Sequence, residues 1–204
     1  MPTLAVLILA GGQSRRMGQD KALLEVNGVS LLRRTWDIGC ALTPEVGIVT
    51  SRVRAYRHLL PESASWMAES PLSPTESPPG PLIAFTQALV QINADWILLL
   101  SCDLPALQVD VLQVWVQQLP ERPNHIVAYL PQHPKGWEPL CGFYRRRCLP
   151  LLQTYVAAGG RSFQQWLAHQ SVQAIADVPI DMLANCNTPE DWAAYCDRST
   201  TQPH

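Results

Sequence analysis

The sequence is poor in charged residues and contains no long apolar run. Lys and Arg together number 15 and Asp and Glu number 17, which gives a net charge of −2, and charged residues make up 16% of the chain. Typical soluble domains contain roughly 25%. This nearly neutral balance argues against a nucleic-acid partner or a polybasic membrane-binding surface. No apolar stretch approaches the ~20 residues that a membrane span needs.

The cysteines lack the spacing of a metal site or of a disulfide framework. The chain has no C-x-x-C pair, and no positively charged leader precedes its first apolar stretch, Leu4 to Ala10. We therefore expect a cytoplasmic protein with reduced thiols. The six cysteines lie at positions 40, 102, 141, 148, 186 and 196.

Two common phosphate-binding loops are also absent, although residues 7 to 24, LILAGGQSRRMGQDKALL, are rich in glycine and basic side chains. A dinucleotide fingerprint needs G-x-G-x-x-G, but the first two glycines here are adjacent. A Walker A loop needs four residues between its glycines and Ser or Thr after its lysine. Here five residues separate Gly12 from Gly18, and Ala22 follows Lys21.

The same stretch has what an anion-binding loop requires. Adjacent glycines after an apolar strand allow backbone N–H groups to approach an anion. Ser14 adds a hydroxyl group, and Arg15, Arg16 and Lys21 add three positive charges within seven residues. In a chain with so few charges, this pattern favours a phosphate site over an ordinary solvated loop.

The order of apolar and amphipathic segments predicts an α/β fold. Strands alternate with helices, which indicates a three-layer α/β/α sandwich with a Rossmann-like, mostly parallel sheet. We expect residues 1–197 to form one domain and residues 198–204 to form a disordered tail. Residues 70–81 contain five prolines and are expected to be a loop, as are residues 131–139. Strands are expected over 4–9, 23–26, 46–50, 65–67, 96–101, 126–130, 140–144 and 172–176. Helices are expected over 31–42, 54–60, 82–91, 110–118, 149–157, 163–169 and from Pro189 onward. Thr188 and Asp191 are expected to cap the last of these helices.

Asp103 follows the second strongly apolar strand, which ends at Ser101. Ligands of parallel α/β sheets bind beyond the carboxyl ends of the strands. Mg²⁺ takes one or two carboxylates together with substrate oxygens and water, so Asp103 is a candidate metal ligand. The alternative is a turn cap, since Asp is common in turns. The phosphate-type loop at the same edge of the predicted sheet favours the metal.

Four segments together resemble a known family. Residues 9–22, LAGGQSRRMGQDKA, resemble the L-A-G-G-x-S-x-R-M-G-x-D-K-A signature of molybdenum cofactor guanylyltransferases, and residues 79–82 (PGPL), 102–105 (CDLP) and 185–191 (NCNTPED) follow in the family's order. The first ten signature positions mark the broader nucleotidyltransferase superfamily. The D-K-A extension and the late N-x-N-T-P-E-D are specific to the molybdenum cofactor branch. The resemblance spans nearly the whole chain.

The resemblance implies a nucleotidyltransferase fold, a Mg²⁺ cofactor, and transfer of GMP from GTP to the phosphate of Mo-molybdopterin with release of pyrophosphate. It places the metal on Asp103 and the triphosphate on Lys21, and it gives Arg16 the leaving pyrophosphate. Asn185 and Asn187 are candidates for the pterin phosphate or for metal-bound water, with helix capping as the alternative. The implied nucleotide-binding residues are Leu9, Ala10, Gly11, Gly12, Ser14, Lys21, Glu69 and Asp103.

Selection of the base depends on an acidic side chain. Guanine presents N1–H and N2–H₂ donors that a carboxylate accepts in bidentate fashion. Glu69 matches the family's acidic position, where Asp is more common, and Glu76 is the rival. Thr50-Ser51 stands where the family tends to have Asn, Ile83 replaces a small residue, and Glu138 replaces a basic residue or His.

Two other activities stay open at this point. One is a cytidylyltransferase that uses CTP on the same cofactor. The other is a nucleotide-binding chaperone that passes the cofactor on without catalysis. The resemblance implies GTP and Mo-molybdopterin as partners, with molybdoenzymes or their chaperones as recipients of the product. We expect a monomer that binds neither nucleic acid nor membrane.

Overall fold

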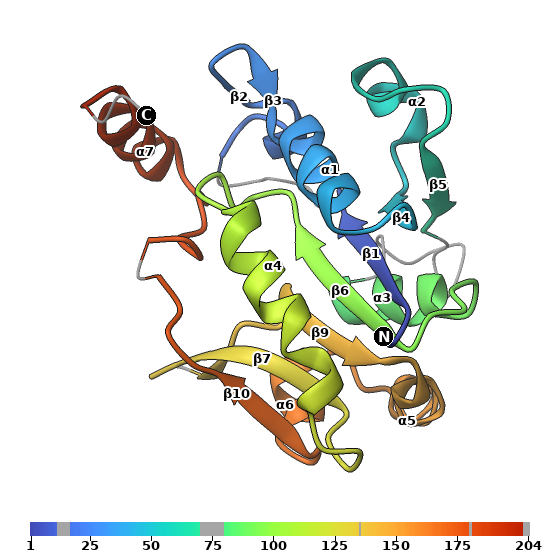
Figure 1. Cartoon of the computed structure of the whole chain (residues 1–204). Coiled ribbons are helices and arrows are strands. Elements are labelled where there is room, and N and C mark those ends of the chain that lie inside the picture. The colour runs from blue at the N-terminus through green and yellow to red at the C-terminus, as the bar shows by residue number, and fades with distance from the viewer. Residues whose placement is uncertain (12–16, 70–79, 135, 180, 202–204) are drawn as a thin grey trace.

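The protein has three layers, with helices on both faces of a central sheet (Figure 1). The computed structural model describes residues 1–11, 17–69, 80–134, 136–179 and 181–201. The predicted α/β/α sandwich with a mostly parallel sheet is therefore confirmed.

The main sheet has the order β10-β7-β9-β6-β1-β4-β5, and β8 pairs with the outer part of β7. Strands β5, β4, β1 and β6 are parallel, whereas β9 runs antiparallel to both β6 and β7. The strands are β1 (Leu4–Leu9), β4 (Val46–Thr50), β5 (Ser65–Ala68), β6 (Trp96–Ser101), β7 (Ala128–His133), β8 (Gly136–Trp137), β9 (Cys141–Arg145) and β10 (Val172–Ile175).

Strand β1 lies in the middle because both of its faces are apolar. Val6, Ile8 and Ala10 belong to the core on one side of the sheet, and Leu7 and Leu9 belong to the core on the other. Such a continuous apolar run is typical of a parallel strand that is covered on both faces. The pairs Leu9↔Val49 and Leu9↔Ser101 then bring the ends of three strands to one edge.

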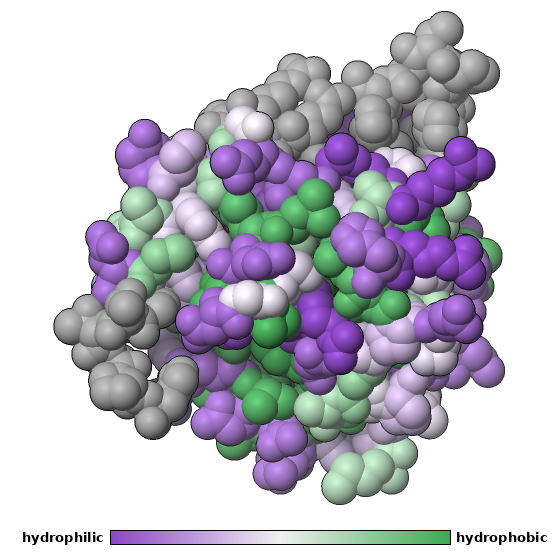
Figure 2. Space-filling model, turned by 90° about the horizontal axis from the view of Figure 1, so that it is seen from above, coloured by the Kyte–Doolittle hydropathy of each residue, from purple (hydrophilic) through white to green (hydrophobic). Residues whose placement is uncertain are grey.

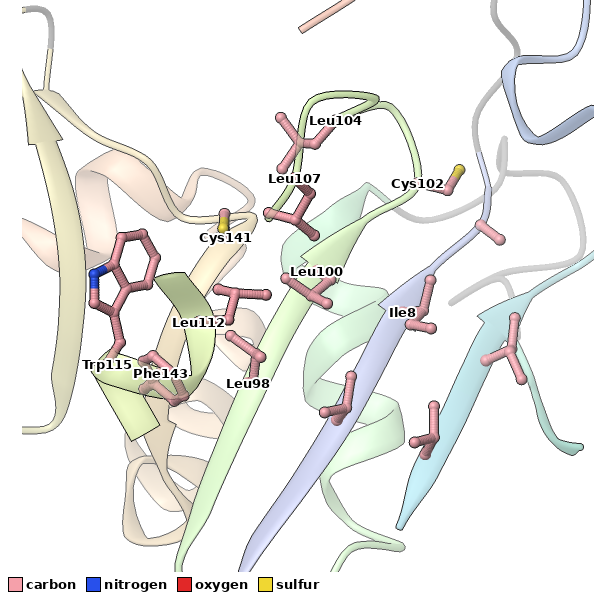
Figure 3. Packing of buried hydrophobic residues seen from close by; sticks show 14 of the residues in the cluster. Ile8, Leu98, Leu100, Cys102, Leu104, Leu107, Leu112, Trp115, Cys141 and Phe143 are labelled. Atoms are coloured by element: carbon pink, nitrogen blue, oxygen red, sulfur yellow. The ribbon is translucent and has the colours of Figure 1, made fainter. Parts of the chain in front are cut away.

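One face of the sheet is covered by α1 (Leu31–Leu42) and α4 (Val109–Gln117) and the other by α3 (Pro81–Leu89), α5 (Leu149–Ala157) and α6 (Phe163–Leu167). Figure 3 shows Leu98 and Leu100 of β6 pointing toward Leu112 and Trp115 of α4. All four side chains are at most 2% exposed. This packing fixes β6, and with it the chain that continues beyond Ser101.

The remaining elements are short, apart from the last helix. They are η1 (Lys21–Leu23), the hairpin β2 (Glu25–Val26) and β3 (Val29–Ser30), α2 (Val53–Tyr56), η2 (Arg57–Leu59), η3 (Leu119–Glu121) and η4 (Arg146–Cys148). Helix α7 (Pro189–Thr201) is the last element, and it stands at the side of the molecule (Figure 1). Helix α7 includes residues 198–201, contrary to the disordered tail predicted over 198–204, and residues 202–204 lie outside the described residues.

The predicted loop over 131–139 is partly wrong. Strand β7 continues to His133 and turns back into β8, with the pairs Gln132↔Trp137 and His133↔Gly136. The loop was expected because prolines at 131 and 134 are unfavourable within a strand. Pro131 sits in a strand where only a backbone N–H is lost, and its carbonyl oxygen accepts a hydrogen bond from the backbone N–H of Glu138 at 2.9 Å.

The cysteines and the helices also bear on the expectations from the sequence. No disulfide joins any of the six cysteines. Among the described residues, no helix combines the length and the apolar character that crossing a membrane requires.

Candidate nucleotide-binding edge of the sheet

The candidate site lies where β1, β4, β5 and β6 end. Parallel strands bring their carboxyl ends to one edge, and here these ends are followed by Gly11, Glu69 and Asp103. Figure 2 views the molecule from this end and shows hydrophilic side chains interspersed with hydrophobic ones. The loop that leads to Lys21 starts at the same edge.

Asp103 and Lys21 form a partly buried ion pair. Lys21 Nζ lies 2.9 Å from Asp103 Oδ2, and the two side chains are 14% and 19% exposed. The other carboxylate oxygen, Oδ1, accepts a short hydrogen bond from the Ser101 hydroxyl group. The two side chains that the sequence assigns to metal and triphosphate are therefore brought together across 82 residues of chain.

Asn187 completes this cluster from the C-terminal part of the chain. Its Oδ1 accepts a hydrogen bond from Lys21 Nζ at 2.7 Å. Capping of α7 is performed by other groups: Asp191 Oδ2 accepts the backbone N–H groups of Asn187 and Thr188, and Thr188 Oγ1 accepts that of Asp191. The Asn187 side chain thus faces the site, whereas Asn185 is exposed.

The cap of α7 is a charge-assisted one. The backbone N–H groups of Asn187 and Thr188 lower the pKa of the Asp191 carboxyl below its ordinary value. The negative charge at the first turn of the helix also suits the helix dipole. Because the same carboxylate holds the Asn187 backbone, the cap orients the amide that contacts Lys21.

Lys21 is positioned by the residue before it. Asp20 caps η1, with its Oδ1 accepting the backbone N–H of Ala22 at 3.2 Å. The Tyr56 hydroxyl group donates to the same carboxylate at 2.8 Å from Oδ2, and Arg52 makes a short ion pair with it. Two residues that follow β4 therefore fasten the segment that carries Lys21.

Glu69 lies directly against Gly11. Its backbone N–H donates to Thr50 O at 3.3 Å. A Cβ atom on Gly11 would stand 2.6 Å from Glu69 Oε1, a distance that real Cβ contacts do not show. Burial raises the pKa of the Glu69 carboxyl above its ordinary value. Glycine at position 11 therefore leaves room for an acidic side chain that arrives from β5.

The backbone around β1 limits what the loop offers to a ligand. Leu9 and Ala10 are 6% and 0% exposed, so only their main-chain atoms are candidates for contact. Ala10 N–H already donates to Val49 O at 3.0 Å, whereas Gly11 is exposed. Four of the proposed site residues lie outside the described residues, namely Gly12, Ser14, Arg16 and Glu76.

The donors at this edge suit a hard cation. Oxygen atoms of Asp103 and Asn187 converge on the ammonium group of Lys21, and carboxylate and amide oxygens are also ligands for Mg²⁺. Within the described ranges, no three His, Cys, Asp or Glu side chains gather as a metal cage.

Cys102, next to Asp103, offers no nucleophile. Burial raises the pKa of its thiol far above the ordinary value, and the Asp103 charge raises it further. A neutral buried thiol is a poor nucleophile, because the thiolate is the reactive form. The Cys102 thiol is therefore unsuited to covalent catalysis.

Three residues of the site escape sequence reasoning. Tyr56 and Arg52 lie more than thirty positions from Asp20, in a segment with no motif of its own. In the sequence, Ser101 is recognisable only as the end of an apolar strand. Its hydroxyl group, polar at the end of five apolar residues, was the one available signal.

The chain matches a known protein family and named relatives over most of its length. The model of the MobA-like NTP transferase domain family matches residues 6–175. A protein of Nostoc sp. named "Probable molybdenum cofactor guanylyltransferase" is 50% identical over 193 residues, which cover 95% of this chain and 90% of the relative. A "Molybdenum cofactor guanylyltransferase" of Pseudomonas putida is 32% identical, covering 93% of this chain and 95% of the relative.

The fold is also found among solved structures. The crystal structure of molybdopterin-guanine dinucleotide biosynthesis protein A from Archaeoglobus fulgidus superimposes with a TM-score of 0.76 at 19% identity. The match covers 97% of this chain and all of the other. At this level of identity the likeness concerns the fold.

The contacts of Tyr56 and Arg52 with the Asp20 carboxylate form a clamp on Asp20, and this clamp can be tested. Tyr56→Phe removes only the hydroxyl group that bonds to a partly buried carboxylate, so the protein should lose about 1–3 kcal/mol of unfolding free energy in urea. Amide exchange at Ala22 and Leu23 should speed up, because Asp20 holds η1. Tyr155→Phe is the matched control, since that hydroxyl makes only longer bonds of 3.3 Å. Equal effects of the two variants would contradict the clamp.

Proposed function

The chain belongs to the family of MobA-like NTP transferase domains, and from this premise we propose that it is a Mg²⁺-dependent molybdenum cofactor guanylyltransferase. The observation that carries the proposal is the cluster at the sheet edge, where Lys21 joins Asp103 and Asn187. The names of relatives that match almost the full chain support guanylyl transfer.

In the proposed reaction, a terminal phosphate oxygen of Mo-molybdopterin attacks the α-phosphorus of GTP. A new phosphorus–oxygen bond forms, the bond from the α-phosphorus to the bridging oxygen of the β-phosphate breaks, and pyrophosphate leaves with that electron pair. The nucleophile is already an anion at neutral pH, so no strong general base is required. Catalysis then depends on in-line positioning and on neutralising charge.

The residues at the edge are suited to neutralising charge. We propose that Lys21 binds the triphosphate and that Asp103 holds Mg²⁺, which supplies positive charge to the phosphate oxygens when bound. Asn187 and Ser101 orient these two side chains through the hydrogen bonds described above. Arg16, outside the described residues, is assigned to the leaving pyrophosphate on the family resemblance.

Glu69 is the proposed reader of the guanine base. Its carboxylate lies against Gly11, at the start of the loop that binds the nucleotide in this proposal. A partly buried carboxylate favours a ligand that brings hydrogen-bond donors, because an unpaired polar group is costly away from water. The N1–H and N2–H₂ groups of guanine are such donors, and cytosine has no equivalent edge.

The decisive experiment is an assay of pyrophosphate release with purified molybdopterin that carries molybdenum. The protein is supplied in turn with each of the four nucleoside triphosphates, with and without Mg²⁺. We expect release with GTP and Mg²⁺ only. Preference for CTP would instead identify a cytidylyltransferase. Binding of nucleotide without any pyrophosphate release would identify a cofactor-binding protein that does not catalyse transfer.

Removal of the Asp103 carboxylate should abolish most of the activity. Asp103→Ala is expected to lower kcat by about 10²-fold or more, the scale seen when a group that stabilises developing charge is lost. Asp37→Ala, an exposed aspartate on α1 that pairs with Arg33, is the control and should retain full activity. Turnover near the normal rate in Asp103→Ala at ordinary Mg²⁺ concentrations would remove Asp103 from the reaction centre.

Substitution of Glu69 should alter the choice of base more than phosphate binding. In Glu69→Gln, the ratio of kcat/KM for GTP to that for CTP should fall by about 10-fold or more, since a charge-assisted hydrogen bond is lost. Glu62→Gln, an exposed glutamate just before β5, is the matched control. If the ratio is unchanged in Glu69→Gln and falls in Glu76→Gln, then Glu76 reads the base.

A further inference from the structure

Glu138 faces the same edge from the other side of β6. Strands β6 and β9 are antiparallel, with Leu100 paired to Cys141 and the Ser101 N–H donating to Leu140 O at 2.9 Å. Asp103 and Glu138 each lie two residues beyond this last hydrogen bond. The register therefore brings the two carboxylates toward each other at the edge of the sheet.

The backbone around Glu138 is held at every residue. Gln164 of α6 bonds both backbone groups of Trp137, at 3.2 and 2.6 Å. Glu138 N–H donates to Pro131 O at 2.9 Å, and the Tyr144 hydroxyl group donates to Pro139 O at 2.8 Å. A segment fixed in this way is suited to recognition, because little conformational entropy is lost on binding.

The Glu138 carboxylate is partly buried and is only weakly satisfied. Its Oε1 accepts the Leu140 N–H at 3.4 Å, a long hydrogen bond. No ion pair links it to another described residue. Burial raises the pKa of this carboxyl, the Leu140 N–H and His133 lower it, and the nearby Asp103 charge raises it. The remaining lone pairs therefore suit a ligand that donates hydrogen bonds.

We propose that Glu138 binds the pterin ring of molybdopterin by accepting the N–H and NH₂ donors of its 2-amino-4-oxopyrimidine edge. The inference rests on the proposed function and assigns the second substrate's ring to a residue of this chain. Guanine and pterin share this pyrimidine ring, so the same kind of acceptor recognises both. In this assignment the Glu69 carboxylate binds guanine and the Glu138 carboxylate binds the pterin.

The order of the strands agrees with this assignment. Glu69 follows β5 and reaches over to Gly11 at the end of β1, Asp103 follows β6, and Glu138 precedes β9. Neighbouring strands are about 4.8 Å apart, so β1, against whose end the Glu69 carboxylate lies, and β9 are separated by roughly 10 Å. The product of the proposed reaction has one donor edge at each end and a pyrophosphate bridge in the middle. The Lys21–Asp103 pair lies between the two glutamates, where that bridge forms.

Two other roles for Glu138 make opposite predictions. A bystander carboxylate beside the phosphate site would repel both anionic substrates, so its neutralisation would lower the KM for each. A second Mg²⁺ ligand would change the Mg²⁺ concentration needed for half-maximal activity. Only a pterin reader, when neutralised, raises the KM for molybdopterin alone.

The test compares Glu138→Gln with the wild-type protein and with Glu121→Gln, an exposed glutamate in η3. In the pyrophosphate assay, Glu138→Gln should raise the KM for molybdopterin by about 10- to 100-fold, the range for a lost charge-assisted hydrogen bond, with the KM for GTP unchanged. The unchanged GTP value also shows that the variant is folded.

A second measurement addresses the donor edge itself. Pterin and lumazine, which has a carbonyl oxygen in place of the 2-amino group, are compared as competitive inhibitors against molybdopterin. The wild-type protein should prefer pterin, and Glu138→Gln should lose that preference. An unchanged KM for molybdopterin, an unchanged preference, a lower KM for both substrates or an altered Mg²⁺ requirement would each overturn the proposal. If the wild-type protein releases no pyrophosphate, the proposed function itself fails.

Discussion

The ion pair between Lys21 and Asp103 is the interaction on which the arrangement of the site depends. It joins the loop after β1 to the chain after β6, and the Asn187 amide brings in the segment before α7. A partly buried ammonium group needs such partners, because an unpaired charge is costly away from water. Under the proposed function, phosphate oxygens and Mg²⁺ would act as further partners of these charges.

The surrounding structure holds these groups in place. The apolar strands β1 and β6 are covered on both faces, which fixes the ends from which Gly11 and Asp103 extend. Tyr56 and Arg52 hold Asp20, and Asp191 holds the backbone of Asn187. Preorganised charges of this kind stabilise a transition state without reorganising during the reaction. The site therefore suits a transfer between anions that needs no acid–base catalyst.

Sequence reasoning reached the layered fold and the central strands, because continuous apolar runs are local signals. It also singled out Lys21 and Asp103 as candidates, and the structure shows that these two side chains are in contact. The hairpin of β7 and β8 was missed because prolines at 131 and 134 indicate a loop. Pro131 is nevertheless part of β7, where its carbonyl oxygen still accepts a hydrogen bond, and Pro134 lies in the turn after the strand. The clamp by Tyr56 and Arg52 was missed because it joins segments that carry no common pattern.

The sequence by itself determined which residues bear the charge and which strands are buried, because hydrophobicity and charge are properties of each residue and its near neighbours. Only the tertiary structure decided which of these residues meet. It turned the Asn187 side chain to Lys21 while Thr188 and Asp191 capped the helix, and it set Glu69 against Gly11. It also brought Glu138 to the Asp103 edge through the register of two antiparallel strands. Such contacts depend on strand order and register, which involve pairings between residues far apart in the chain.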